Sequence, residues 1–241
     1  MTLPLFRDDA YLTETSAVVT GVNERGGIIL DRTIFYPTGG GQPGDRGRLT
    51  LSDGTVIDIA TTVKGESPDE IVHVPTEGSP LPDVGAEVTA EIDWEFRHRL
   101  MRMHSCLHLL CSLVEGGVTG GSISQEKSRL DFDLQDTSLD KELLTRELNR
   151  LIQEDHSLSS QWITDAELAQ QPELVRTMSV KPPTGEGQVR LMNIEGIDLQ
   201  PCGGTHVRST AEIGAVRVSK IENKGKHNRR INILFEATAT T

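Results

Sequence analysis

Two pairs of potential metal ligands, about ninety residues apart, constrain the fold of this chain more than any other feature. The stretch "HSCLH" holds His104 and His108, and "PCGGTH" holds Cys202 and His206. Imidazole nitrogen and thiolate sulfur suit zinc, and four such ligands complete a tetrahedral site. The sequence therefore predicts that the second half of the chain folds so that all four side chains reach one zinc ion.

The first pair is expected on a helix. Apolar residues recur every three or four positions between Leu100 and Val114, which predicts a helix over residues 94–115. His104 and His108 stand one turn apart on it, so both imidazoles leave the same face. A histidine pair alone also fits the polar flank of an amphipathic helix. The second pair, in a turn rich in glycine, favours the metal site.

The other residues of this helix do not extend the ligand set. Cys106 lies about 160° around the helix from His108, and we assign it to the core. Ser105 stands where the metalloprotease motif H-E-x-x-H carries its glutamate, so a peptidase is not favoured. A complete four-ligand set is usual for structural zinc, whereas hydrolytic zinc keeps one position open, and the spacing leaves both alternatives open.

The first part of the chain has the pattern of a small all-β domain. Short alternating or apolar runs, broken by Gly, Pro and Asp, extend from residue 16 to about 91 and predict a β-barrel-like domain over residues 1–92, closed by a strand in "EVTAEID". Asp93 is a plausible N-cap for the helix that follows. The expected architecture is α+β, with residues 93–241 forming a second domain of helices packed on a mainly antiparallel sheet.

A second amphipathic helix is expected within "LDKELLTRELNRLIQED". Its inward side chains should be Leu143, Leu144, Leu148, Leu151 and Ile152. The strands predicted around it are "SRLDFDL", "LSSQWIT", "GQVRLMNI", "GAVRVSKIE" and "RRINILFEA".

Composition and charge limit the classes of function. No apolar run approaches the twenty residues of a membrane span, the N-terminus lacks the features of a signal peptide, and three cysteines are too few for a disulfide framework. We therefore expect a cytoplasmic protein with no membrane partner. A net charge of −12 argues against a general nucleic-acid coat protein. One local basic stretch is present, and it also fits a solvated hairpin; it contains Arg217, Lys220, Lys224, Lys226, Arg229 and Arg230.

The glycines of "YPTGGGQPGDRG" match the dinucleotide-binding pattern G-x-G-x-x-G at Gly39, Gly41 and Gly44. That fingerprint requires a helix that begins at the third glycine and holds the pyrophosphate. Here Pro43 precedes Gly44 and an alternating strand pattern follows. We therefore expect no nucleotide cofactor and interpret the stretch as a loop close to the substrate.

Three stretches together, "DRTIFYPTGGGQPGDRG", "RMHSCLHLLCSLV" and "PCGGTH", resemble the alanyl-tRNA editing proteins, which are free-standing relatives of the editing domain of alanyl-tRNA synthetase. In length and in its β-domain, the chain resembles the medium-sized class. The resemblance implies zinc-dependent hydrolysis of the ester that links a wrong amino acid to tRNA(Ala), chiefly serine and secondarily glycine. It also implies that His104, His108, Cys202 and His206 are the zinc ligands.

The resemblance implies further site residues. Thr33 matches a hydroxyl that senses the serine side chain, and the substrate-binding loop comprises Gly39, Gly40, Gly41 and Gln42. An editing site that hydrogen-bonds the serine hydroxyl rejects alanine, which lacks it. If tRNA binds, the candidate phosphate contacts are the basic stretch named above together with Arg97, Arg99 and Arg102.

Two other classes of function remain open at this point. A zinc-stabilised RNA-binding module without activity would use a closed four-ligand site. A zinc hydrolase of a small-molecule ester or amide would need no tRNA. Within the editing proteins, a threonyl-type activity shares the ligand spacings, and the glycine loop favours the alanyl type.

Overall fold

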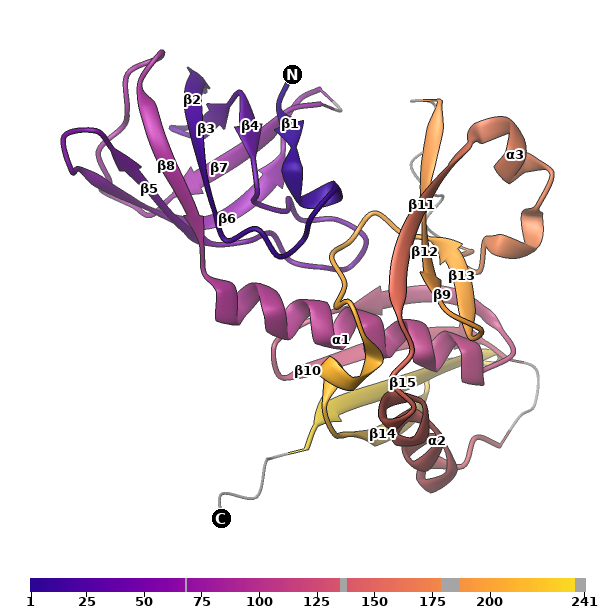
Figure 1. Cartoon of the computed structure of the whole chain (residues 1–241). Helices are drawn as coiled ribbons and strands as arrows, with labels where there is room; N and C mark the ends of the chain where they lie inside the picture. Colours follow the sequence, from indigo (N-terminus) through magenta and orange to yellow (C-terminus); the bar gives the residue numbers. More distant parts are fainter. Residues whose placement is uncertain (68, 135–137, 179–186, 237–241) are drawn as a thin grey trace. The chain divides into compact units, whose positions relative to one another are not determined.

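The computed structural model describes residues 1–67, 69–134, 138–178 and 187–236, which belong to two compact units, Met1–Arg99 and Leu100–Thr241 (Figure 1). The chain is strand-rich with few helices, and the division between the units falls within helix α1 (Trp94–Leu113). No helix in the described residues is long and apolar enough to cross a lipid bilayer.

The first unit contains a closed barrel of six strands in the order β2-β3-β7-β6-β5-β8. Alternate residues along these strands point inward, as the period of two requires, and fill the interior with branched apolar side chains. The expected closing strand is confirmed, since β8 pairs with both β2 and β5. The strands are β2 (Glu14–Val22), β3 (Ile28–Leu30), β5 (Gly47–Leu51), β6 (Val56–Lys64), β7 (Ile71–Pro75) and β8 (Glu87–Ile92).

Outside the barrel, β1 (Leu3–Pro4) and β4 (Arg32–Thr33) form a short parallel pair. A one-turn helix, η1 (Leu5–Arg7), follows β1. The glycine-rich loop lies between β4 and β5. The chain therefore continues from the loop into a barrel strand, and no helix begins at Gly44.

The described residues of the second unit form two antiparallel sheets. One has four strands in the order β14-β15-β10-β9, and the other has three in the order β11-β12-β13. The strands are β9 (Gly117–Ser122), β10 (Lys127–Asp133), β11 (Leu158–Thr164), β12 (Gln188–Ile194), β13 (Asp198–Pro201), β14 (Val216–Asn223) and β15 (Asn228–Phe235). The helices after α1 are α2 (Lys141–Gln153), α3 (Asp165–Ala169), η2 (Pro172–Leu174) and η3 (Thr210–Ile213).

Helix α1 begins where its sequence predicts. The Asp93 carboxylate accepts a hydrogen bond from the Phe96 N–H at 3.0 Å, which is the expected N-cap contact. The helix ends at Leu113, two residues before the predicted position 115. Cys106 is fully buried, which confirms its assignment to the core.

Helix α2 corrects one assignment. Leu144, Leu148, Leu151 and Ile152 are buried, as expected, but Leu143 is 42% exposed. Leu143 shares a helix face with Glu147 and Arg150, at spacings of four and seven residues, and that face is turned away from the core. The prediction that Leu143 points inward was therefore wrong.

Candidate metal centre

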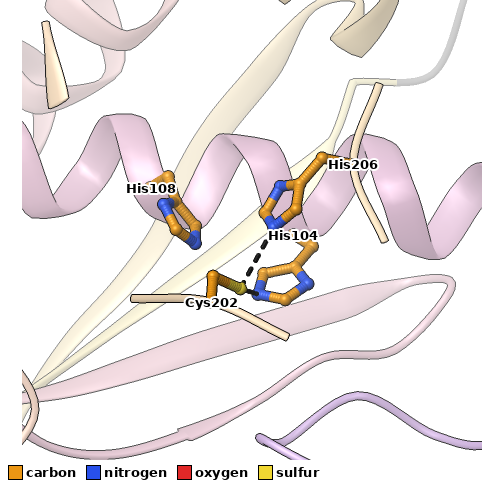
Figure 2. A group of neighbouring side chains, drawn as sticks. All are labelled: His104, His108, Cys202 and His206. Carbon is orange, nitrogen blue, oxygen red and sulfur yellow. Dashed lines mark hydrogen bonds between the residues drawn. The ribbon is translucent and has the colours of Figure 1, made fainter. Parts of the chain in front are cut away.

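The four predicted ligands converge on one point in the second unit. His104 and His108 come from α1, Cys202 follows β13, and His206 lies in the next loop (Figure 2). One ligand atom from each of the four lies within 4.8 Å of all the others. The Cys202 Sγ is 3.5 Å from His104 Nε2 and 3.2 Å from His206 Nε2. Three imidazoles and one sulfur thus surround a single centre.

The turn that carries Cys202 is held by the neighbouring strand. The Cys202 N–H donates to the Arg190 carbonyl at 3.0 Å, which extends the β12–β13 ladder by one residue. The Arg190 Nη1 donates back to the carbonyls of Cys202 at 3.1 Å and Gly204 at 3.0 Å. One guanidinium therefore fixes both sides of the turn and, with it, the direction of the sulfur.

The three cysteines differ in their acidity. Burial raises the pKa of Cys106 and of Cys111 to about 12. Burial also acts to raise the pKa of Cys202, but its electrostatic interactions and hydrogen bonds with the surrounding histidines, His104 and His206 first, outweigh it and hold that pKa well below its usual value. Cys202 is therefore the most acidic of the three thiols, and the thiolate is the form that binds metals.

His108 is supported from behind by a buried carboxylate. Its Nδ1 lies 3.3 Å from Asp198 Oδ2 and 2.9 Å from Gln200 Nε2, and Gln200 donates to Asp198 at 2.7 Å. Burial lowers the pKa of His108, but hydrogen bonding with Asp198 and Cys202 outweighs this and raises it to about 9. Because Nδ1 is enclosed, Nε2 is the nitrogen left for a metal, and the carboxylate makes it a stronger ligand.

His206 has a comparable support. Its Nδ1 lies 3.1 Å from the Ser105 hydroxyl, which also accepts the Val207 N–H at 3.3 Å. Ser105 therefore orients the ring so that Nε2 faces Cys202. Sequence reasoning considered Ser105 only as a missing general base and did not identify Asp198 or Gln200, although both lie within four residues of Cys202 in "DLQPC".

The donor set fits zinc chemically. Two imidazoles have hydrogen-bonding partners on the nitrogen turned away from the centre. The pKa of the Cys202 thiol is held well below its usual value, and burial with the neighbouring His104 lowers the pKa of His206 in the same way. A thiolate and neutral imidazoles are the forms that bind a metal, so binding would release the proton that Asp198 and Cys202 favour on His108.

Thr33 lies in the first unit and is fully buried. Its Oγ1 is 2.7 Å from His73 Nε2 and accepts the Phe35 N–H at 3.0 Å. Burial lowers the pKa of His73 to about 4, so the ring is neutral, and its Nδ1 lies 3.0 Å from the Ile28 carbonyl and donates to it. Nε2 therefore accepts the Thr33 proton. The sequence indicated no role for His73.

The glycine loop is a closed turn. Gly39 and Gln42 exchange backbone hydrogen bonds of 3.0 and 2.9 Å, and Gln42 is fully buried. Gly40 and Gly41, at the exposed tip, have φ of 57° and 81°, values that favour glycine. At Gly44 a Cβ atom would stand 1.8 Å from the Thr62 carbonyl oxygen. The glycines are thus needed for the backbone conformation and close packing of the loop.

The comparisons with known proteins agree with this geometry. Residues 189–232 match the family described as the threonyl and alanyl tRNA synthetase second additional domain, and residues 6–96 match that described as tRNA synthetases class II (A). The alanyl-tRNA editing protein AlaX-M of Methanosarcina acetivorans is 35% identical, over 96% of this chain and 98% of its own. The chain belongs to the alanyl-tRNA editing protein family.

Other relatives differ in their own length. The AlaX-M protein of Pyrococcus horikoshii is 33% identical over 98% of this chain and 99% of its own. An alanine–tRNA ligase of Pyrobaculum neutrophilum is 35% identical over 92% of this chain, which is 25% of the ligase. The matches to these two proteins therefore cover both units of this chain.

The structure overturns one of the expected tRNA contacts of this alanyl-tRNA editing family member. The Arg97 side chain is fully buried, and its guanidinium forms an ion pair with Asp45. It also donates to the carbonyls of Ala10 at 2.9 Å and Ile34 at 2.6 Å. The charge of Arg97 is already neutralised by the buried Asp45 carboxylate and is not available to a phosphate, so the prediction for Arg97 was wrong.

Of the other two arginines of α1, Arg102 is half-buried and Arg99 is exposed. Arg102 donates to the Ile213 carbonyl at 2.7 Å and stacks on the Phe235 ring, and Arg99 lies one turn earlier. On the basic hairpin of β14 and β15, several charges are engaged locally. Lys220 and Lys224 pair with Glu222, Arg229 donates to Asn223, and Arg230 pairs with Asp131. Arg217 and Lys226 are exposed.

Proposed function

We propose that this protein deacylates mischarged tRNA(Ala) in a zinc-dependent reaction, with seryl-tRNA(Ala) as the chief substrate and glycyl-tRNA(Ala) as a second. The similarity over nearly the whole chain to proteins named alanyl-tRNA editing protein supports the substrate class. The observation that carries the proposal is the convergence of three histidines and one thiolate on a single centre.

In this proposal His104, His108, Cys202 and His206 hold the zinc ion. A bound zinc ion supplies either activation of a water molecule or an anchor for the amino group of the substrate. The surrounding residues keep the ligands in position. Asp198 supports His108, Ser105 supports His206, and Arg190 supports the cysteine turn.

Thr33 and the glycine loop are assigned to recognition of the amino acid. A synthetic site cannot strongly reject a substrate that carries one more hydroxyl, whereas an editing site that bonds this hydroxyl discriminates against alanine. Because the Thr33 proton is donated to His73, Thr33 Oγ1 offers the serine hydroxyl an acceptor. Gly39, Gly40, Gly41 and Gln42 form the loop assigned to the same role.

The remaining basic residues of α1 and the hairpin are assigned to the phosphate backbone, with exposed Arg217 and Lys226 as the leading contacts. Arg99, Arg102, Lys220, Lys224, Arg229 and Arg230 stay candidates, although most of them also have partners within the protein.

The decisive test is a deacylation assay on tRNA(Ala) charged with serine, glycine or alanine, with and without a chelator, beside a metal analysis. We expect rapid loss of serine, slower loss of glycine, retention of alanine, and loss of activity on chelation. Equal rates on serine and alanine would contradict the proposal. If chelation unfolds the protein and no tRNA is deacylated, the zinc-stabilised RNA-binding module is correct instead.

A further inference from the structure

The three-stranded sheet places an exposed aromatic side chain in line with the metal centre. In antiparallel pairs, residues directly opposite each other project from the same face. Trp162 on β11 is opposite Arg190 on β12, and Arg190 is opposite Cys202. The three side chains therefore form one row across the sheet, from the edge strand to a ligand of the proposed zinc ion.

The opposite face of this sheet is occupied. Val189 and Leu191 project from it and pack with Leu168 of α3 in an apolar cluster that also includes Ile163. The face that carries Cys202 also carries Gln200 and Asp198, the residues behind His108. Trp162 thus belongs to the metal side of the sheet.

Trp162 does not serve as a core residue on this face. Its side chain is 43% exposed, and its neighbours along the strand, Ser159, Ser160 and Gln161, are exposed and polar. Tryptophan beside a polar, solvent-facing edge offers a flat π surface without an apolar patch around it. Such a surface suits the stacking of an unpaired base.

The spacing matches the substrate of the proposed function. Adjacent strands lie about 4.8 Å apart, so two spacings separate Trp162 from Cys202 by roughly 10 Å. That separation is of the order of one nucleotide. In an aminoacyl-tRNA the ester is on the ribose of the 3′-terminal adenosine, and the base of that adenosine is unpaired. Arg190 adds a positive charge between the two positions.

We propose that Trp162 is the stacking platform for the terminal adenine of the tRNA, which positions the attached ester at the metal centre. This inference rests on the proposed function, because it takes its ligand from that substrate. It assigns Trp162 to substrate binding and not to the chemical step. It also predicts that recognition at this point is independent of the amino acid.

The test uses binding of an uncharged RNA, so that it does not depend on turnover. The probe is a hairpin RNA with the acceptor stem of tRNA(Ala) and a single-stranded CCA end, compared with the same hairpin ending in an abasic residue. The chain has two tryptophans, so a Trp94→Phe background leaves Trp162 as the only tryptophan, whose emission is excited selectively over that of the two tyrosines. We expect the CCA hairpin to quench its fluorescence, and the abasic hairpin to quench it little and to bind roughly tenfold more weakly.

Three variants complete the experiment. In anisotropy measurements with a labelled CCA hairpin, Trp162→Ala should weaken binding roughly tenfold, while Trp162→Phe should retain most of it. Gln161→Ala, on the opposite face of the same strand, should leave it unchanged. Zinc content and thermal unfolding of each variant control for folding.

Equal binding of the two hairpins, or unchanged binding by a folded Trp162→Ala, would overturn the inference. Failure of the proposed function is distinguishable, because the deacylation assay would then show no release of amino acid while adenine-dependent quenching persisted. With activity present, Trp162→Ala should raise KM more than it lowers kcat.

Discussion

The hydroxyl of Thr33 and the Nε2 of His73 lie 2.7 Å apart inside the first unit, and neither side chain is exposed to solvent. Since His73 Nδ1 donates to the Ile28 carbonyl, this contact fixes the direction of the Thr33 proton. A residue assigned to recognition of serine is thus oriented by a histidine forty positions away in sequence.

Replacing the Thr33 hydroxyl should impair discrimination more than metal binding. For Thr33→Val we expect kcat/KM on seryl-tRNA(Ala) to fall roughly 10- to 100-fold with zinc content unchanged, because the contact to the serine hydroxyl is lost. Thr33→Ser should recover most of the activity. Thr2→Val removes another buried hydroxyl, bonded to the Leu30 carbonyl, and serves as the matched control. Equal losses in both variants would assign Thr33 to stability alone.

The buried His73 should make stability depend on pH. Its pKa is about 4 in the folded chain, against an ordinary value of 6.5, so the unfolded state binds the extra proton. The stability contributed by neutral His73 is therefore complete above about pH 6.5 and is lost as the pH falls towards 4, by about 3 kcal/mol.

Urea unfolding of the wild type and of His73→Gln measures this effect, since the other titrating groups are common to both. We expect the difference in their free energies of unfolding to shrink between pH 7 and pH 4.5, because the variant has no proton to take up at this position. Parallel profiles would show that His73 titrates normally.

Only one of the three cysteines should matter for zinc. Cys202→Ser should lose the metal and the deacylase activity together, because a neutral hydroxyl replaces the thiolate. Cys111→Ser, at a thiol whose pKa burial raises to about 12, should keep the metal and lose only some stability. Metal analysis of the purified variants decides between them, and zinc retained by Cys202→Ser would remove it from the site.

The carboxylate behind His108 should tune metal affinity without being a ligand. We expect Asp198→Asn to weaken zinc binding roughly 10- to 100-fold, measured by competition with a chelator, with one zinc per chain still bound at saturation. Unchanged affinity would leave Asp198 with a structural role only.

A bulky side chain at Gly40, at the tip of the glycine loop, should lower the deacylase activity. Gly40 and Gly54 both have positive φ, and a Cβ atom at either would have no heavy atom within 4 Å. Val at each position therefore introduces similar backbone strain without a clash. If the loop contacts the substrate, Gly40→Val should lower kcat/KM well beyond Gly54→Val, at equal zinc content. Matching effects would make the loop an ordinary turn.

The sequence predicted local features well. The helical period, the Asp93 cap and the three-residue spacing of both ligand pairs are encoded by neighbours along the chain. The residues that hydrogen-bond to the ligands could not be predicted from local sequence patterns. Asp198 and Gln200 are recognisable only once the register of β13 places them behind His108.

The contacts of Arg97 and of His73 also differ from the sequence-based expectation, for the same reason. Charge normally marks the surface, and nothing around Arg97 in the sequence indicates that Asp45 lies opposite it in the barrel unit. His73 meets Thr33 only because the barrel closes with β7 beside β3. Contacts made by the closure of a sheet depend on the complete strand order, which no local pattern contains.

Helix α1 contributes Arg97 to the first unit and His104 to the second, which limits how the two parts can be separated during evolution. A cut before the helix would leave the Asp45 carboxylate buried without its counter-charge, and removing one partner of a buried pair costs about 3–5 kcal/mol. A cut after Arg99 would remove the first turns of the helix that carries the ligands. The barrel and the metal-binding unit are therefore expected to be inherited as a single module, and in the alanine–tRNA ligase of Pyrobaculum neutrophilum the match indeed spans 92% of this chain.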